Sequence, residues 1–294
     1  MRLSELNDGN PASGVQAPDR TRMIMAAKAA AGRSWTDPHH VQMRARASKA
    51  RAAYRCASPV AQSMDRVSIA QVSQDGVQEV AQIDFNFDVP QFRPTQLALK
   101  RAFDIVAASI GIVLLLPLLV LIALLIKTGS KGPVLFRQDR TGLNNKPFTI
   151  FKFRSMYTDR CDISGVTQTR RDDARITPIG RVLRRTNLDE LPQLFNVLKG
   201  EMSLIGPRPH VPGMYAAGML YEDLIDDYAH RHHMRPGITG LAQCNGLRGP
   251  TTEPEPAALR IVHDLEYVQS FSLWLDMKIL FKTMVNEIFS GKGF

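Results

Sequence analysis

Two adjacent carboxylates, Asp189 and Glu190, are the residues of this chain best suited to chemistry. They stand in the segment TNLDELPQL, where Thr186 or Asn187 is predicted to cap a short helix that carries both acids in its first turn. Neighbouring side chains on a helix point in different directions, so one carboxylate can attack an electrophile while the other holds a divalent cation. A structural alternative remains open, because acids in a first turn also suit the helix dipole.

Basic residues in rigid turns accompany this pair and favour the chemical alternative. Arg208 lies in LIGPRPH and Arg235 in MRPGITG, where prolines and glycines restrict the backbone around one guanidinium. Arginine binds phosphate oxygens through two parallel hydrogen bonds. Any one of these side chains could be an ordinary solvated residue, but together they predict a phosphate-binding set of Arg184, Arg208, Arg235, Lys152 and Arg154.

The overall charge points to anionic partners. The 294 residues include 37 Lys and Arg against 28 Asp and Glu, a formal net charge of +9. Such a balance fits nucleic acid, acidic lipid head groups or phosphorylated substrates. The sequence contains no Walker A, G-x-G-x-x-G or H-E-x-x-H motif, and its three cysteines form no C-x-x-C pair. These patterns therefore indicate neither a P-loop nor a zinc site nor a disulfide framework.

A long apolar segment is the strongest physical signal in the chain. No charged residue occurs between Ile105 and Ile126, and a bilayer core needs about 20 apolar residues in a helix. Pro117 stands near the middle, where a proline removes a backbone hydrogen bond and kinks the helix. Basic residues flank both ends, and since basic flanks mark the cytoplasmic side, the pattern predicts a re-entrant helix-break-helix. The alternative is a kinked single span with the preceding residues translocated.

Composition divides the chain into three zones. Residues 1–95 form a basic tail that is predicted to be disordered, with an amphipathic segment at Met23–Ala31 as the alternative. Residues 96–131 comprise the membrane helix and its flanks. Residues 132–294 are predicted to form a compact cytoplasmic domain, α+β in class and mostly helical, with a small β-hairpin and amphipathic interfacial helices.

Local patterns within residues 132–294 predict one hairpin and several helices. Asn144-Asn145 separates two short apolar runs, as a hairpin loop does. Short helices are expected at Ile179–Leu183 and Leu188–Leu198, and longer ones at Leu259–Ser270 and Leu273–Phe289. The last of these has a stripe at helical spacing that indicates core or membrane-surface packing rather than a ligand site, formed by Trp274, Met277, Phe281, Met284 and Val285.

From Lys100 to the C-terminus the chain resembles the bacterial sugar transferase family, the monotopic phosphoglycosyl transferases. The resemblance rests on six segments in the family's order: KRAFDIV, GPVLFRQDRTG, FKFRSM, RVLRRTNLDELPQLFNVLKGEMSLIGPRP, RPGITGLAQCNGLRG and HDLEYVQSFSLWLDMKIL. Long co-linear segments are far more specific than a short motif. Residues 1–95 lie outside the resemblance.

The resemblance implies two-step covalent catalysis at the cytoplasmic face of a bacterial inner membrane. Asp189 would attack the sugar-linked phosphorus of a UDP-sugar, UMP would leave, and undecaprenyl phosphate would then take the phosphosugar. Glu190 would hold Mg²⁺. The family pattern also assigns phosphate or substrate contacts to Arg184, Arg208 and Asp264, lipid phosphate or head-group contacts to Lys100, Arg101 and Asp104, and the helix break to Pro117.

Two other functions stay open at this stage. A membrane-tethered binder of anionic polymers would explain the charge, but no nucleic-acid-reading motif accompanies the arginines, so nucleic acid is not an expected partner. A non-catalytic membrane scaffold would retain the fold, and the intact Asp189–Glu190 pair argues against it. The run NGLRGPT resembles family members that transfer glucose phosphate or galactose phosphate in exopolysaccharide assembly, and this resemblance implies one of these hexoses, with glucose preferred. A homo-oligomer is left open.

Overall fold

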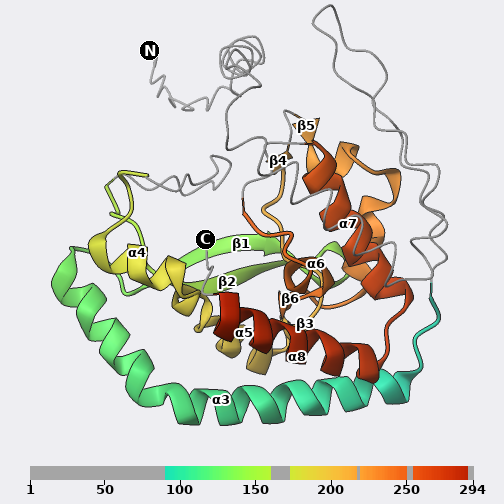
Figure 1. Cartoon of the computed structure of the whole chain (residues 1–294), viewed down its shortest axis with the longest axis horizontal. Coiled ribbons are helices and arrows are strands. Elements are labelled where there is room, and N and C mark those ends of the chain that lie inside the picture. The colour runs from blue at the N-terminus through green and yellow to red at the C-terminus, as the bar shows by residue number, and fades with distance from the viewer. Residues whose placement is uncertain (1–89, 160–172, 217–218, 250–253, 291–294) are drawn as a thin grey trace, which may run out of the picture. The chain divides into compact units, whose positions relative to one another are not determined.

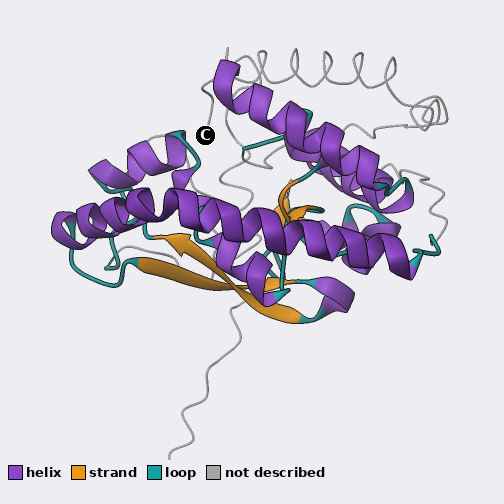
Figure 2. Cartoon of the chain, turned by 90° about the horizontal axis from the view of Figure 1, so that it is seen from below, coloured by secondary structure: helices purple, strands orange, loops and turns teal. Residues whose placement is uncertain are grey.

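The computed structural model describes residues 90–159, 173–216, 219–249 and 254–290, all of them within one unit of the chain, Arg46–Phe294. The tail predicted for residues 1–95, with its amphipathic segment, lies almost wholly outside the described residues. Within the described part the chain is mostly helical and has three two-stranded sheets (Figures 1 and 2). The predicted α+β class, mostly helical, is therefore confirmed.

A single long helix, α3 (Pro94–Gly129), carries the apolar segment. Among the described residues it is the one helix long and apolar enough to cross a membrane. Figure 1 shows that α3 bends partway along its length, and Pro117 lies inside it. Because the backbone stays helical through the proline, the predicted break takes the form of a bend within one helix.

Strands β1 (Leu135–Thr141) and β2 (Pro147–Phe153) form the antiparallel hairpin that the sequence predicts. A short 3-10 turn, η2 (Leu143–Asn145), connects them, and Asn144 and Asn145 have positive φ angles of 53° and 59°. Asparagine adopts this left-handed conformation more readily than most residues that carry a Cβ. The hairpin prediction is therefore confirmed, together with its turn.

The segment around the two acids is divided among three short elements. Helix α4 (Pro178–Arg185) precedes the 3-10 turn η3 (Leu188–Glu190), and helix α5 (Gln193–Lys199) follows it. Gly200 ends α5 in the left-handed conformation, φ 85°, as the helix-stop signal predicts. The first predicted helix is confirmed, whereas the second is a 3-10 turn followed by a separate helix.

The predicted capping of this segment by Thr186 or Asn187 is wrong. The Thr186 hydroxyl donates back to the Val182 carbonyl, 2.9 Å away, at the end of α4. Asn187 has a left-handed backbone, φ 55°, and its side chain makes no capping hydrogen bond. The two acids therefore follow a sharp change of chain direction instead of opening a regular helix.

The remaining elements follow Gly200. Strand β3 (Ser203–Ile205) pairs in parallel with β6 (Gly237–Thr239), and β4 (Tyr215–Ala216) pairs antiparallel with β5 (Met219–Leu220). The 3-10 segments and helices of this part are η4 (Tyr221–Asp223), η5 (Asp226–His233), α6 (Leu241–Cys244), α7 (Pro254–Gln269) and α8 (Leu273–Ser290). The two long helices predicted near the C-terminus are confirmed.

Helix α8 exposes its apolar stripe. Trp274 and Phe281 are 69% and 71% exposed, and Met284 is exposed as well. The side chains that pack into the domain core belong instead to another face of the helix, with Ile279 buried and Leu280 packed beside it. Three of the five stripe residues are thus exposed, which fits the predicted membrane-surface packing, while Met277 and Val285 are half-buried.

Helix α3 packs against the domain near both of its ends. Close to its start, Phe103 packs against a cluster of residues from β3, α7 and α8. Close to its end, Ile122 and Ile126 are buried with Phe153 of β2 and Leu183 of α4. Between them, Ala108 and Ile112 pack against α5, and exposed apolar side chains cover the face of the helix that points away from the domain. One domain thus holds both ends of the apolar helix.

Two charged residues at the start of α3 point into the protein. Lys100 Nζ donates to Asp276 Oδ2 at 2.7 Å and to the Ile205 carbonyl at 2.9 Å. Asp104 Oδ1 accepts a hydrogen bond from the Ser203 hydroxyl at 3.0 Å. Lys100 and Asp104 are both buried, and buried charges need such partners. This geometry does not support the lipid contacts predicted for Lys100 and Asp104.

Candidate active site

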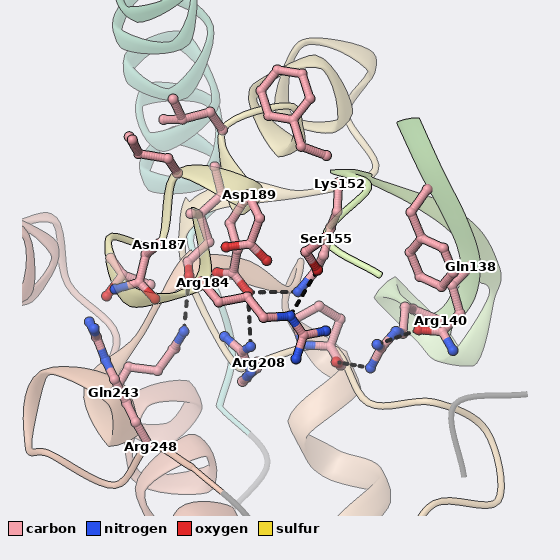
Figure 3. Close-up of a pocket in the computed structure, with 18 of the residues that line it drawn as sticks. Gln138, Arg140, Lys152, Ser155, Arg184, Asn187, Asp189, Arg208, Gln243 and Arg248 are labelled. Carbon is pink, nitrogen blue, oxygen red and sulfur yellow. Dashed lines mark hydrogen bonds and ion pairs between the residues drawn. The ribbon is translucent and has the colours of Figure 1, made fainter. Parts of the chain in front are cut away.

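The two acids lie at a cavity of about 1270 Å³ lined by the hairpin, the η3 turn, the loop after β3 and parts of α6, α7 and α8. Figure 3 shows Lys152, Asp189 and Arg208 close together in this cavity. Ligand pockets of about 300–1,000 Å³ hold drug-sized molecules. This cavity is therefore large enough for a nucleotide-sized ligand.

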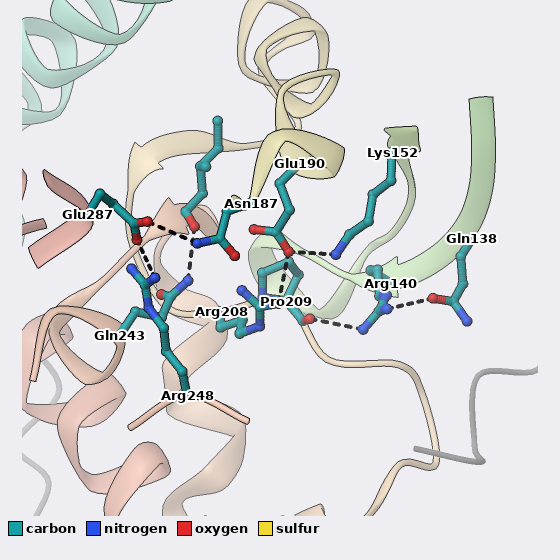
Figure 4. A network of polar contacts seen from close by, with 11 residues as sticks. Gln138, Arg140, Lys152, Asn187, Glu190, Arg208, Pro209, Gln243, Arg248 and Glu287 are labelled. Atoms are coloured by element: carbon teal, nitrogen blue, oxygen red, sulfur yellow. Dashed lines mark hydrogen bonds and ion pairs between the residues drawn. The ribbon is translucent and has the colours of Figure 1, made fainter. Parts of the chain in front are cut away.

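Two cations converge on Glu190. Lys152 Nζ donates to Glu190 Oε1 at 2.7 Å, and Arg208 Nη2 donates to the same oxygen at 3.0 Å (Figure 4). Burial alone would raise the pKa of Glu190, but Arg208 and Lys152 outweigh it and hold that pKa well below its usual range. Glu190 is therefore ionised at neutral pH, and two cations for one carboxylate leave a positive charge that suits phosphate.

Asp189 has the opposite electrostatic environment. It is 9% exposed, and burial, helped by the adjacent Glu190, raises its pKa to about 6 against the attraction of Lys152 and Arg184. Arg184 lines the cavity, and its Nε donates to Ser155 Oγ at 2.8 Å. Near neutral pH Asp189 is thus mostly ionised but weakly stabilised, which is the state a carboxylate nucleophile requires.

Hydrogen bonds fix the backbone around Arg208, while the Arg208 side chain stays exposed at the cavity. Arg231 Nη2 donates to the Arg208 carbonyl at 2.5 Å, and Arg140 Nη1 donates to the Pro209 carbonyl at 3.2 Å. Arg231 is itself buried and paired with Asp264. The Arg208 side chain is 44% exposed. Asp264, for which the sequence predicted a substrate contact, lines the cavity, but its ion pair with Arg231 makes it a support for Arg208.

Three arginines predicted to bind phosphate or lipid instead satisfy carbonyls at helix ends. Arg154 donates to backbone carbonyls at the end of α3, and Arg101 and Arg235 donate to those at the end of α5. Cations at this position complement the helix dipole. Arg154 borders the cavity with its guanidinium committed to α3, and Arg235 is not among the residues that line it. The geometry therefore does not support the predicted roles of Arg101, Arg154 and Arg235.

Comparison with known proteins accounts for this arrangement. Residues 95–290, beginning within α3, match the bacterial sugar transferase family. The chain belongs to this family. The match covers both the apolar helix and the residues that line the cavity.

Relatives with known names match about two thirds of the chain. The exopolysaccharide production protein PSS of Rhizobium leguminosarum bv. phaseoli is 59% identical over 198 residues, 67% of this chain and 99% of that protein. The undecaprenyl-phosphate glucose phosphotransferase of Komagataeibacter xylinus is 52% identical over 213 residues, 71% of this chain and 40% of that protein. The UDP-glucose:undecaprenyl-phosphate glucose-1-phosphate transferase of Escherichia coli (strain K12) is 48% identical over 198 residues, 67% of this chain and 42% of that protein. The chain thus spans nearly all of the first relative and less than half of the other two.

The cavity of this sugar transferase also contains residues that no sequence pattern singled out. Arg140 and Ser155 stand inside the segments GPVLFRQDRTG and FKFRSM, so membership of a shared segment is a signal that could have identified them. Burial and the nearby Arg208 lower the pKa of Arg140 to about 10. The same signal covers Gln138, Asn187, Gln243 and Arg248, which also stand inside shared segments (Figures 3 and 4). Glu287 lies outside all of these segments and has no local signal.

The oxygen atoms at the site suit the predicted Mg²⁺ only together with a substrate. Among the residues that the structure describes, no group of three or more His, Cys, Asp and Glu side chains could hold a metal. Lys152 and Arg208 both bind Oε1 of Glu190, which leaves its second oxygen and Asp189 as donors. Mg²⁺ is usually bound by one or two carboxylates plus substrate phosphates. The donor set fits that mode of binding.

Proposed function

We propose that this chain transfers a hexose 1-phosphate, with glucose as the sugar, from a UDP-sugar to undecaprenyl phosphate and releases UMP. The observation that carries the proposal is the pair of adjacent carboxylates in one cavity. Glu190 is paired with cations, whereas Asp189 makes no comparable ion pair among the residues that the structure describes. The donor and acceptor are those in the names of relatives at 48–52% identity. The reaction would begin exopolysaccharide assembly, as the name of the Rhizobium relative suggests.

In the first step a carboxylate oxygen of Asp189 attacks the phosphorus that carries the sugar. The bond from that phosphorus to the oxygen bridging the two phosphates breaks, and UMP leaves with the bridging oxygen. The hexose phosphate stays on Asp189 as an acyl phosphate. Arg208, Lys152 and Arg184 stabilise the charge that develops on the phosphate oxygens, and Mg²⁺ bound by Glu190 and the diphosphate would supply further charge neutralisation.

In the second step a phosphate oxygen of undecaprenyl phosphate attacks the same phosphorus. The bond to Asp189 breaks, the carboxylate is regenerated, and the product is undecaprenyl diphosphate hexose. Since a polyprenyl chain stays in the bilayer, the cavity must lie at the membrane surface. The apolar α3 and the exposed stripe of α8 are suited to hold it there.

The packing of α3 supports a re-entrant topology, and the basic residues that flank both ends of the apolar segment favour the cytoplasmic side for the domain. Both ends of the helix contact the one domain, through Phe103 near the start and Ile126 near the end. A helix that crossed the bilayer would place its ends on opposite sides, where one domain of this size could not pack against both. The bend at Pro117 lets the helix enter and leave on one face.

Release of UMP by the purified full-length chain in lipid nanodiscs tests the function. With undecaprenyl phosphate, Mg²⁺ and a panel of UDP-sugars, the proposal predicts release that requires UDP-glucose and forms undecaprenyl diphosphate glucose. Release with UDP-galactose alone would correct the sugar. No release with any donor, from folded protein, would favour a membrane scaffold, and salt-dependent binding of an oligonucleotide would favour a binder of anionic polymers.

Labelling from one side of the membrane tests the topology. Single cysteines at Thr95 and Lys131, near the ends of α3 and both exposed, are treated with a membrane-impermeant reagent, and the unsubstituted chain gives the background. A re-entrant helix predicts that both react in inverted vesicles and that neither reacts in intact cells. Reaction of one site on each side would establish a single span.

A further inference from the structure

A polar contact joins helix α8 to the turn that carries the nucleophile. Asn187 Nδ2 donates to Glu287 Oε2 at 3.0 Å, across 100 positions of sequence (Figure 4). The other Glu287 oxygen accepts from Arg248. Asn187, Arg248 and Glu287 all line the cavity. Glu287 thus connects three separate segments at one wall of the site.

The Asn187 end of this contact controls the backbone of η3. Its left-handed conformation redirects the chain between α4 and the two acids, and its carbonyl accepts from the Glu190 amide at 3.1 Å. Asp189 lies between these two anchored residues. A rotation at Asn187 would therefore move the Asp189 carboxylate relative to Lys152 and Arg208.

The Arg248 end is also held in a defined geometry. Gly246 and Gly249 flank it with positive φ angles of 82° and 100°, a region that residues with a Cβ rarely adopt. This turn presents the guanidinium to Glu287. The carboxylate of Glu287 is therefore oriented from both sides, toward Asn187 by one oxygen and toward Arg248 by the other.

Helix α8 presents Glu287 and the exposed part of its apolar stripe on different faces. Leu280, Thr283 and Glu287 line the cavity, whereas Trp274 and Phe281 are exposed. At about 100° of rotation per residue, the mean directions of these two sets differ by about 140°. One helix thus joins the outer surface of the domain to the turn of Asp189.

We propose that Glu287 is a positioning residue, which holds the Asp189 turn through Asn187 and has no contact with the reacting atoms. This assignment rests on the proposed transfer reaction for its kinetic consequences. Loss of the contact lets Asp189 sample orientations that are wrong for attack on phosphorus. Since misplacement of a reacting group by about 1 Å can cost about 100-fold in rate, the effect falls on kcat.

Kinetics of matched variants test the assignment. Glu287→Ala is expected to lower kcat about 10–100-fold while KM for UDP-glucose changes less than about threefold. Glu287→Gln keeps one acceptor for Asn187 and is expected to recover part of kcat. Asn187→Gly keeps the left-handed backbone but removes the amide, so it should match Glu287→Ala, and the double variant should be no slower than either.

A second contact of α8 provides the control. Lys282 Nζ donates to Asn245 Oδ1 at 2.6 Å, and Lys282 lies outside the residues that line the cavity. Lys282→Gln also removes a polar link between α8 and the loop after α6, yet it should leave kcat within about twofold. Equal losses in the Glu287 and Lys282 variants, or additive losses in the double variant, would overturn the proposal.

Hydrogen exchange separates this proposal from the proposed reaction. The Glu190 and Leu191 amides donate within the turn, and their exchange is expected to accelerate in Glu287→Ala and to stay at the wild-type rate in Lys282→Gln. If wild-type protein releases no UMP, the transfer reaction fails, and the exchange rates still report whether Glu287 holds the turn. Unchanged exchange in Glu287→Ala would contradict the positioning role.

Discussion

Among the residues that the structure describes, two lysine–carboxylate pairs have the same length but lie in different surroundings. Lys100 contacts Asp276 at 2.7 Å between α3 and α8, and Lys152 contacts Glu190 at 2.7 Å at the cavity. In the first pair the side chains are 6% and 1% exposed, and in the second they are 18% and 16% exposed. Arg208 adds a second cation at Glu190 only.

The difference separates a structural ion pair from a ligand site. At Asp276 the second oxygen accepts from the Tyr267 hydroxyl, and Lys100 also donates to the Ile205 carbonyl, so both charges are satisfied within the protein. At Glu190 two cations share one oxygen, which leaves positive charge at an open cavity. Distance alone does not distinguish these cases, whereas exposure and the balance of charges do.

The largest effect is expected from breaking the buried pair. Lys100→Met leaves Asp276 buried without its cation, which should lower the free energy of unfolding by about 3–5 kcal/mol. Thermal unfolding in detergent measures the loss, and activity per folded molecule should persist. Lys152→Met should show the reverse, with activity lost and stability nearly kept. If both variants lower the free energy of unfolding by the same amount, the Lys152–Glu190 pair is as structural as the Lys100–Asp276 pair.

His263 is a buried ionisable group that stays neutral, and its burial makes the stability of the protein depend on pH. Burial lowers the pKa of His263 from 6.5 to about 4. The unfolded chain therefore binds the proton more tightly than the folded chain does. The free energy of unfolding has the full contribution of the neutral imidazole above pH 6.5, and this contribution is lost as the pH falls through about 4. At about 1.4 kcal/mol per pKa unit this contribution is about 3 kcal/mol. His263→Gln should flatten the dependence of unfolding on pH between 6.5 and 4, and an unaltered slope would refute the assignment.

Arg208→Lys tests whether the second cation at Glu190 serves the ligand. Lysine keeps the charge but cannot form the two parallel hydrogen bonds to phosphate, so activity should fall about 100-fold, or about 2.7 kcal/mol. The half-exposed side chain contributes little to stability, and the melting temperature should change by only a degree or two. A large fall in melting temperature would show that Arg208 is a structural residue.

The smallest effect is expected at a third lysine–carboxylate pair. Lys199 lies 3.9 Å from Glu201, and the two side chains are 53% and 32% exposed. Lys199 also lies over the Phe151 ring at 4.5 Å. Lys199→Ala should lower the free energy of unfolding by less than about 1 kcal/mol, and added salt should reduce the difference further. A larger loss would mean that the exposure of the side chains does not determine how much each lysine–carboxylate pair contributes to the free energy of unfolding.

Local patterns predicted the elements well where periodicity is strong. The apolar run from Ile105 to Ile126, the hairpin at Asn144-Asn145 and the helix from Leu273 follow from spacing and turn residues within a short window. The shared segments also identified Asp189 and Glu190 as site residues together with Lys152, Arg184 and Arg208. The structure places all five at one cavity.

Partners distant in sequence could not be predicted in this way. Lys100 and Asp276 are 176 positions apart, so nothing near Lys100 indicates that it is buried. Arg235 sits in a rigid Pro-Gly turn, as a phosphate-binding residue would, but the carbonyl it meets belongs to Gly200. Residue type and turn chemistry describe what a side chain can bind, and tertiary packing determines what it meets.

A covalent intermediate on Asp189 is the central claim, and trapping it is the most direct test. Protein in nanodiscs without undecaprenyl phosphate is mixed with UDP-glucose and Mg²⁺, quenched, digested and examined by mass spectrometry. The account predicts one burst of UMP per chain, a hexose phosphate on the peptide that contains Asp189, and its disappearance when the lipid is added. Asp189→Asn should give neither. Release of UMP only when the lipid is present, or an adduct on another residue, would contradict the account.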